Sequence, residues 1–260
     1  MYGKGGIGKS VVATGLSAHF AIEGRRVLHV GCDPKRDSSL KLIGHMPTKT
    51  AVDLVGLDPG AVSAQQLIIK GRNGVDCIEA GGPEPGLGCG GRGVARALEI
   101  MSEIDLLETG GYDAVIFDVL GDVVCGGFAA PLRQGFARKV VIVVSEEPMA
   151  LFAANNIAKA VVTYQSNGVF LAGLVANLRS EDRSGLVERF AERIGTRVLV
   201  TLMRDPEIIA AERRCRTVLE HAPESPGARA LRDLARAVTE VAAADAPSPL
   251  PDDAFFEMIT

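Results

Sequence analysis

Residues 3–10 read Gly-Lys-Gly-Gly-Ile-Gly-Lys-Ser, a pattern that few folds accommodate. It satisfies G-x-x-x-x-G-K-[ST], in which glycine N–H groups surround phosphate, the lysine reaches the β- and γ-phosphates and the hydroxyl binds Mg²⁺. Such a loop leads into a helix whose positive N-terminus faces the same anion. The pattern predicts a helix over about residues 9–23, with Lys9 on phosphate and Ser10 on Mg²⁺.

The segment before this loop is unusually short. A phosphate loop should follow a buried parallel strand, and only Met1 and Tyr2 precede this one. Either the first strand is a two-residue stub, or the start of the chain has been assigned too late. The sequence leaves both alternatives open.

The rest of the chain alternates apolar, strand-like runs with helical patterns. Strands are predicted near 26–31, 114–117, 139–144, 170–177 and 197–201. Helices are predicted near 61–70, 94–109, 148–165, 183–194, 206–213 and 226–243. This alternation predicts an α/β P-loop NTPase fold, with a mostly parallel sheet and helices on both faces.

The expected organisation is one P-loop domain over residues 1–245 and a Pro-rich tail over residues 246–260. The tail either frays or acts as a strap across another subunit or a partner.

Composition excludes several classes of function. The chain has 260 residues, a net charge of −4, 5% aromatic residues and five cysteines. With no basic block, we expect neither nucleic acid nor an anionic membrane as a partner. The odd cysteine count argues against a disulfide framework and favours the reducing cytoplasm. Cys32 and Cys77 lie in strand-like surroundings and are predicted to be core residues.

Two other cysteines lie among glycines. Cys89 belongs to the first Gly-Cys loop, residues 81–94, and Cys125 to the second, residues 118–128. Bare backbone lets amide N–H groups approach an anion closely. An iron–sulfur cubane needs four thiolates, and a two-fold symmetric dimer doubles the two offered here. The hypothesis is one [4Fe-4S] cluster shared by Cys89 and Cys125 of two identical chains; the alternative is two inert buried thiols.

Carboxylates follow two of the predicted strands. Asp33 and Asp37 come after the strand near 26–31, and Asp118 ends the strand at 114–117. The carboxyl ends of parallel strands are where α/β sheets bind ligands, so Asp33 and Asp37 are candidates for the Mg²⁺ and water region. The alternative is a solvated turn. Seven extended residues reach at most roughly 24 Å, so the loop from Asp118 to Cys125 is long enough to touch nucleotide and metal centre.

Together these motifs resemble the nitrogenase iron protein family. The resemblance covers roughly residues 1–240 and rests on the phosphate loop with its extra Lys4, on residues 31–35, on both Gly-Cys loops and on residues 153–156. It implies an ATP-hydrolysing, one-electron reductase with one [4Fe-4S] cluster per homodimer. Such a protein docks on a larger nitrogenase-like catalytic component and takes electrons from a low-potential ferredoxin or flavodoxin.

The resemblance also implies roles for single residues. Lys4 resembles the signature lysine that reaches nucleotide across the dimer interface, Asp33 the residue beside hydrolysis and Asp122 the carboxylate oriented to the attacking water. Arg92 resembles the exposed arginine that faces the catalytic partner, an ADP-ribosylation site in some nitrogenase iron proteins. The residues assigned to nucleotide and Mg²⁺ are Gly3, Lys4, Gly5, Gly6, Gly8, Lys9, Ser10, Asp37, Asp118, Asn177 and Asp205.

Departures from the nitrogenase pattern bear on the subtype. Gly90 and Gly91 look more like the reductases of chlorophyll synthesis, and Ile209 stands where nitrogenase often has a Gln near adenine. The mixture suggests a methylthio-alkane reductase, with nitrogenase or (proto)chlorophyllide reductase as the other subtypes. The alternative from another class is a non-redox switch ATPase of the partitioning, positioning or metal-delivery type, which shares Lys4, Lys9 and Ser10.

The cluster hypothesis predicts that Cys89→Ser removes the iron while the chain still folds, because one of two thiolates per chain is lost. Iron analysis after anaerobic purification, with circular dichroism as the folding control, measures this. A variant that keeps a full cubane would show that Cys89 is not a ligand.

Overall fold

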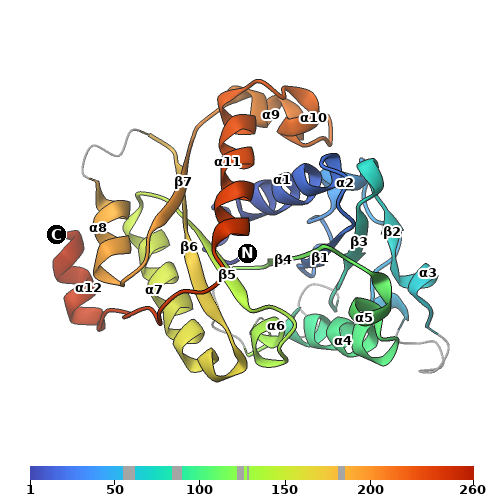
Figure 1. Ribbon diagram of the computed structural model, residues 1–260, viewed down its shortest axis with the longest axis horizontal. Coiled ribbons are helices and arrows are strands. Elements are labelled where there is room, and N and C mark those ends of the chain that lie inside the picture. Colours follow the sequence, from blue (N-terminus) through green and yellow to red (C-terminus); the bar gives the residue numbers. More distant parts are fainter. Residues whose placement is uncertain (55–61, 84–89, 122–125, 128, 181–184) are drawn as a thin grey trace.

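The structure is a computed structural model that describes residues 1–54, 62–83, 90–121, 126, 127, 129–180 and 185–260 (Figure 1). Its strands form two groups, in the orders β2-β3-β1-β4 and β5-β6-β7. The strands are β1 Val27–Cys32, β2 Ile69–Lys70, β3 Asp76–Glu79, β4 Ala114–Val119, β5 Lys139–Val144, β6 Phe170–Leu178 and β7 Val198–Met203.

Every strand pair except β2 with β3 is parallel. This confirms the predicted mostly parallel α/β architecture. The antiparallel β2 was not predicted, because a two-residue edge strand carries no periodicity.

Helices connect and cover the strands. The longer helices are α1 Lys9–Ile22, α4 Gly90–Glu103, α7 Pro148–Thr163, α8 Leu186–Arg193, α11 Pro226–Glu240 and α12 Asp252–Ile259. The shorter ones are α2 Leu40–Ile43, α3 Ala64–Leu67, α5 Leu106–Gly110, α6 Ala130–Arg133, α9 Pro206–Glu212 and α10 Val218–His221. Among the helices described, none is long and apolar enough to cross a bilayer.

Two predicted helices are shorter than expected. The helix predicted over 94–109 divides into α4 and α5, because Asp105 between them adopts a left-handed backbone with φ of 46°. The helix predicted over 61–70 is only the single turn α3, which the Ser63–Gln66 capping box begins. Ile69 then already belongs to β2.

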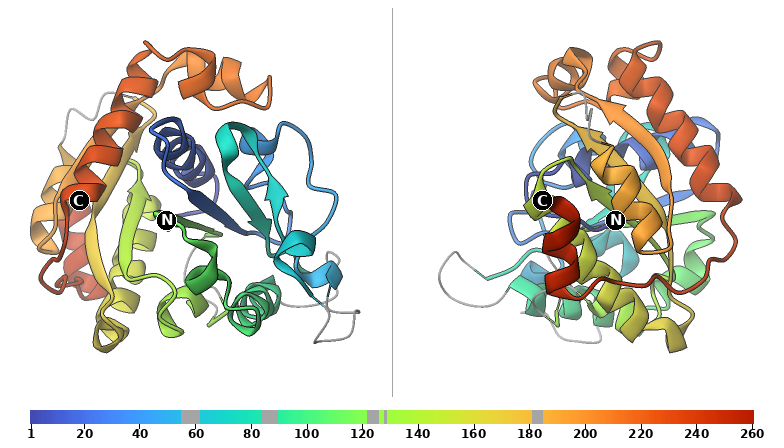
Figure 2. Two further views of the ribbon diagram at one scale, coloured as in Figure 1. Left: turned by 45° about the vertical axis from the view of Figure 1, so that its right-hand side comes forward. Right: turned by 90° about the vertical axis from the view of Figure 1, so that its left-hand side faces the viewer.

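The core has two layers, one on each face of the strands. Figure 2 shows helices on both faces. Helices α1 and α11 pack together over one face and contact β4 and β7. Helices α4 and α7 contribute to the other layer, which includes Leu98 and Leu151. Both faces of the strands are therefore covered, which explains why the strands are continuous apolar runs rather than alternating ones.

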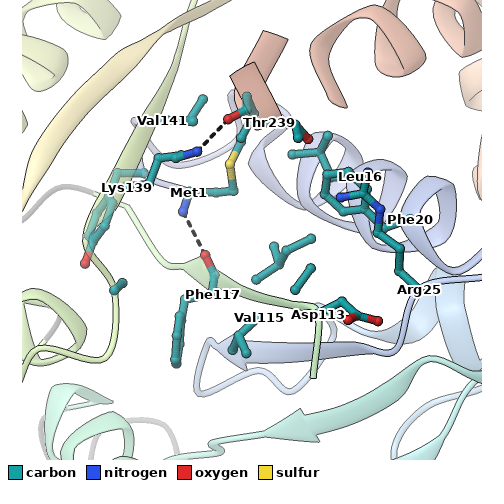
Figure 3. Close-up of a pocket in the computed structure, with 15 residues that line it drawn as sticks. Met1, Leu16, Phe20, Arg25, Asp113, Val115, Phe117, Lys139, Val141 and Thr239 are labelled. Carbon is teal, nitrogen blue, oxygen red and sulfur yellow. Dashed lines mark hydrogen bonds between the residues drawn. The ribbon is translucent and has the colours of Figure 1, made fainter. Parts of the chain in front are cut away.

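Met1 and Tyr2 join the two strand groups. Tyr2 pairs in parallel with Ile142 of β5. On the other side the Met1 carbonyl accepts a hydrogen bond from the Val119 N–H of β4, at 3.1 Å. The Met1 amino group also donates to the Phe117 carbonyl of β4, at 2.8 Å (Figure 3). These two residues therefore occupy the position of a central strand.

The C-terminal segment packs on its own chain, so the expectation of a frayed tail is wrong. The Asn155 side chain on α7 exchanges two hydrogen bonds with the Leu250 backbone, at 2.8 and 2.9 Å. Phe255 is fully buried and packs edge-on against Phe152 and Phe190. These contacts make Phe255 of α12 a part of the core, and a contact of the tail with another subunit or a partner stays a prediction.

We therefore expect Phe255→Ala to cost about 3–5 kcal/mol of unfolding free energy, the usual loss for a buried aromatic. Phe256→Ala is the matched control, because Phe256 is 47% exposed and its removal leaves a smaller cavity. Urea denaturation measures both. Equal losses for the two variants would contradict the packing of α12.

Candidate functional site

A cleft lies at the carboxyl ends of β1 and β4, beside the N-terminus of α1. Its first lobe, the phosphate lobe, has a volume of about 520 Å³. The structure brings most of the predicted phosphate and Mg²⁺ residues to this lobe. They are Gly5, Gly6, Gly8, Lys9, Ser10, Asp33, Asp37 and Asp118.

The phosphate loop is held by contacts that need glycine. Gly8 has φ of 95°, and a Cβ there would lie 2.4 Å from Asn177 Nδ2. Gly3, with φ of 142°, passes so close to β5 that a Cβ would lie 2.2 Å from the Val143 carbonyl oxygen. The Lys9 ammonium folds back and donates to the Lys4 carbonyl at 2.9 Å. Because α1 begins at Lys9, its first N–H groups open onto the lobe.

A second lobe of about 320 Å³ continues past Gly6 and Gly8 to Asn177, Asp205 and Ile209. Asn177 Nδ2 donates to the Ile7 carbonyl at 2.8 Å and so supports the phosphate loop. Asp205 accepts from the Glu207 and Gly227 N–H groups, which ties α9 to α11. Both side chains are thus structural supports here, and their predicted adenosine contacts stay predictions.

A buried hydrogen-bond chain runs under the phosphate lobe. His29 on β1 contacts Ser17 Oγ through Nδ1 and Ser38 Oγ through Nε2, each at 2.9 Å. The Ser38 hydroxyl donates to Asp118. Burial lowers the pKa of His29 to about 4, so the ring is neutral at pH 7. Since Ser38 donates to Asp118, it accepts from Nε2–H, and Nδ1 accepts from Ser17. The chain therefore orients the Asp118 carboxylate.

A second buried carboxylate holds the neighbouring residue. Glu79 Oε1 accepts from both the N–H and the hydroxyl of Ser39, at 2.7 and 2.6 Å. Glu79 Oε2 has no hydrogen-bond partner among the described residues. It lies 2.2 Å from where a Cβ on Gly31 would be, so Gly31 makes room for it. Burial raises the pKa of Glu79 to about 7, against the effect of the Ser39 hydrogen bonds.

The segment between β1 and Ser38 carries the two predicted Mg²⁺-side carboxylates. Asp33 accepts from the Lys35 N–H at 2.8 Å, and burial raises its pKa. Asp37 is exposed at the mouth of the lobe. Asp33 and Asp37 thus both lie at the cleft, as predicted. The hydrogen bonds of Ser38 and Ser39 hold the far end of their segment.

The Gly-Cys loops are described only in part. Cys89, Cys125 and Asp122 lie outside the described residues. Their flanking glycines nevertheless meet, since a Cβ on Gly127 would lie 2.3 Å from Gly91 Cα. Arg92 follows at the start of α4 and is exposed, as predicted for a partner-facing residue.

The first Gly-Cys loop also packs against Pro34, which lies next to the phosphate lobe. The Pro34 ring lies 2.3 Å from a Cβ position on Gly90 and 2.7 Å from one on Gly82. Pro34 is bonded directly to Asp33, which lines the lobe. The contacts of Pro34 with Gly82 and Gly90, and of Gly91 with Gly127, thus link the nucleotide cleft to the flanks of both cysteines.

Sequence reasoning missed His29, Ser38, Ser39 and Glu79. Two of them could have been found, because His29 and Glu79 are polar residues within apolar, strand-like segments, residues 26–31 and 75–79. The predictions for Cys32 and Cys77 are confirmed, because both are fully buried and burial raises both pKa values.

Comparison with known proteins decides the family. The profile of the 4Fe-4S iron sulfur cluster binding proteins, NifH/frxC family, matches residues 1–260. The chain belongs to this family. The subtype within it remains a prediction.

Solved structures show that this NifH/frxC-family chain has a P-loop ATPase fold. The septum site-determining protein MinD of Pyrococcus horikoshii OT3, complexed with Mg-ADP, is 22% identical with a TM-score of 0.72, over 93% of this chain and 95% of that one. The cell division ATPase MinD of Pyrococcus furiosus is 21% identical with a TM-score of 0.68, over 93% and 97%. A ParA family ATPase from Chlorobium tepidum TLS is 18% identical with a TM-score of 0.68, over 90% and 94%.

Glu79 predicts a pH effect on the stability of this family member. Its pKa rises from 4.5 to about 7 on folding, so the native state binds more protons across that window and loses stability as pH increases. Glu79→Gln keeps an acceptor for Ser39 and removes the charge. Relative to the original chain, the variant should gain up to about 3 kcal/mol between pH 5 and pH 8. Urea denaturation of both proteins at pH 5 and pH 8 tests this. If the difference in unfolding free energy between the variant and the original chain is the same at both pH values, the prediction is refuted.

Proposed function

We propose that the chain is the ATP-dependent electron donor of a nitrogenase-like reductase. In this proposal a homodimer binds one MgATP per subunit and one [4Fe-4S] cluster, which Cys89 and Cys125 of both chains hold. It passes single electrons to a larger catalytic component. The observation that carries the proposal is the glycine-mediated contact between Pro34, the first Gly-Cys loop and Gly127.

The cleft suits a magnesium nucleoside triphosphate. The phosphate lobe combines loop N–H groups, the Lys9 ammonium and the Ser10 hydroxyl with the carboxylates of Asp37 and Asp118. This set pairs cation and N–H donors for phosphate with oxygen ligands for Mg²⁺. Asp33 lies at the same lobe and is the candidate for orienting water. Lys4 contributes from the opposite subunit in this proposal, while its own carbonyl anchors Lys9.

The flanks of the cysteines suit an anionic cluster. Gly91 and Gly127 touch backbone to backbone, so no side chain stands between the two loops there. Bare N–H groups beside thiolates stabilise cluster charge and tune its potential. When bound, the cluster supplies reversible one-electron chemistry. Among the described residues no group of three or more His, Cys, Asp or Glu forms another metal site.

Coupling follows from the same contacts. The segment 33–39 lines the phosphate lobe at one end and, through Pro34, packs on Gly82 and Gly90. A shift of Asp33 that accompanies hydrolysis is transmitted through these contacts, because a proline ring against a glycine backbone has no side chain that can yield. In other NTPases, segments beside the γ-phosphate likewise change structure on hydrolysis.

Anaerobic purification with iron and sulfide analysis tests the proposal. We expect about four irons per dimer and a cluster whose reduction potential changes when MgATP binds. ATP hydrolysis with fewer than two irons per dimer would instead support the non-redox switch ATPase. The catalytic component is identified by adding candidate partners and measuring ATP-dependent electron transfer.

Gly127→Ala tests the contact between the loops. The added Cβ would lie 2.3 Å from Gly91 Cα, so we expect cluster occupancy to fall ~10-fold or more, which corresponds to about 1.4 kcal/mol. Gly126→Ala is the matched control, because the nearest heavy atom to its Cβ among the described residues would be Arg133 Nη1, at 3.9 Å, which is an ordinary van der Waals contact. Iron content and nucleotide affinity are measured for both. If Gly127→Ala keeps a full complement of iron, the contact between Gly91 and Gly127 no longer supports the proposed cluster site.

A further inference from the structure

An ion pair at the nucleotide cleft joins two segments that lie far apart in the chain. Lys41 belongs to α2, which follows β1, and Glu212 is the last residue of α9, which follows β7. Lys41 Nζ donates to Glu212 Oε1 at 3.2 Å. Both residues line the phosphate lobe. The pair therefore connects the two strand groups beside the space that a polyphosphate would fill.

The Lys41 side chain is unusually enclosed for a lysine. It is 13% exposed, whereas the Glu212 side chain is 42% exposed. Lysine is seldom buried unless its charge is paired. An ammonium has three N–H donors, and Glu212 takes one of them. Among the residues that the structure describes, this ammonium makes no other hydrogen bond, so it keeps donors for a ligand in the lobe.

Glu212 marks the place where the two lobes of the cleft meet. It lines the phosphate lobe and the second lobe, and so do three residues of the phosphate loop and α1, Gly6, Gly8 and Val11. In the proposed nucleotide site the phosphates lie in the first lobe and the nucleoside in the second. The phosphate at the junction is then the α-phosphate, because it joins the nucleoside to the rest of the phosphate chain.

Arg72 holds the backbone on either side of the ion pair. Its Nη1 donates to the Lys41 carbonyl at 3.2 Å and to the Cys215 carbonyl, just after α9, at 2.7 Å. Gly44 makes room for this guanidinium, since a Cβ there would lie 2.2 Å from Arg72 Nη2. The two segments thus stay together without the ion pair, and only the Lys41 side chain needs to adjust to a ligand.

Charge favours a phosphate beside Lys41. An unpaired Glu212 carboxylate at the junction would repel the α-phosphate, and the Lys41 ammonium offsets that repulsion. The hydrogen bond to Glu212 also orients the ammonium before a ligand arrives. A hydrogen bond between an ammonium and a phosphate oxygen is charge-assisted and so belongs to the stronger class.

We propose that Lys41, oriented by Glu212, binds the α-phosphate of the nucleotide. The inference rests on the proposed nucleotide site and is independent of the cluster. Lys9 serves the β- and γ-phosphates in the phosphate-loop pattern, so Lys41 adds a second lysine at the other end of the phosphate chain. Because ADP and ATP share the α-phosphate, Lys41 contributes equally to the binding of both.

A purely structural ion pair explains these contacts less well. Arg72 already joins the two segments through their backbone carbonyls. An ion pair whose carboxylate is well exposed adds little to stability. The enclosure of Lys41 at the lobe is therefore better explained by a ligand than by fastening α2 to α9.

Lys41→Met tests the contact, because methionine removes the ammonium and keeps an unbranched apolar side chain. We expect the Kd values of MgADP and MgATP to rise by the same factor, ~10-fold, and to depend less on salt concentration. Lys41→Arg keeps the charge and should retain most of the affinity. Lys159→Met is the matched control, since it removes the same charge and the ion pair with Asp252, and neither residue lines the cleft. Isothermal titration calorimetry on the purified protein measures all four.

Three results would overturn the α-phosphate contact. The first is unchanged Kd values in Lys41→Met, and the second is an equal loss of affinity in Lys41→Met and Lys41→Arg, which would show that the charge is not what matters. The third is a loss confined to MgATP, which would place Lys41 at the γ-phosphate. If the original chain binds neither nucleotide, the proposed nucleotide site itself fails, and the role of Lys41 fails with it.

Discussion

One row of residues across three parallel strands governs the site. Because β1 pairs with both β3 and β4, Gly31 lies beside Glu79 on one side and Asp118 on the other. Gly31 has no side chain, and the Glu79 carboxylate takes the space that a Cβ would fill. The two buried carboxylates then hold consecutive serines, Ser39 by Glu79 and Ser38 by Asp118. A slip of one residue would turn these side chains to the opposite faces and release the segment that carries Asp33 and Asp37.

The segment 33–39 connects the nucleotide cleft to the Gly-Cys loops. At one end it lines the phosphate lobe, and at Pro34 it packs on the backbone of Gly82 and Gly90. Gly91 in turn backs onto Gly127. Each contact is closer than a residue with a Cβ allows, so the glycines around the cysteines serve packing as well as access to an anion. This gives the proposed electron donor a short mechanical path between nucleotide and cluster.

The sequence predicted the parts of the fold that periodicity marks. Continuous apolar runs identified β5 and β6 almost to the residue, because strands covered on both faces need no polar positions. It could not predict β2, the break at Asp105 or the docking of α12. A two-residue edge has no pattern, and the other two depend on which distant surface a segment meets. The tail composition indicated a linker, while Phe255 belongs to the core because Phe152 and Phe190 form a pocket for it.

For the site, the sequence alone determined which functional groups are present: a phosphate loop, carboxylates after strands and two cysteines among glycines. These follow from local residue types and spacing, which a chain carries before it folds. Only the tertiary structure decided that neutral His29 orients Asp118, that Glu79 is a buried carboxylate with a raised pKa, and that Met1 and Tyr2 bond to both β4 and β5. Each of these depends on neighbours far apart in the chain, which strand register and burial bring together.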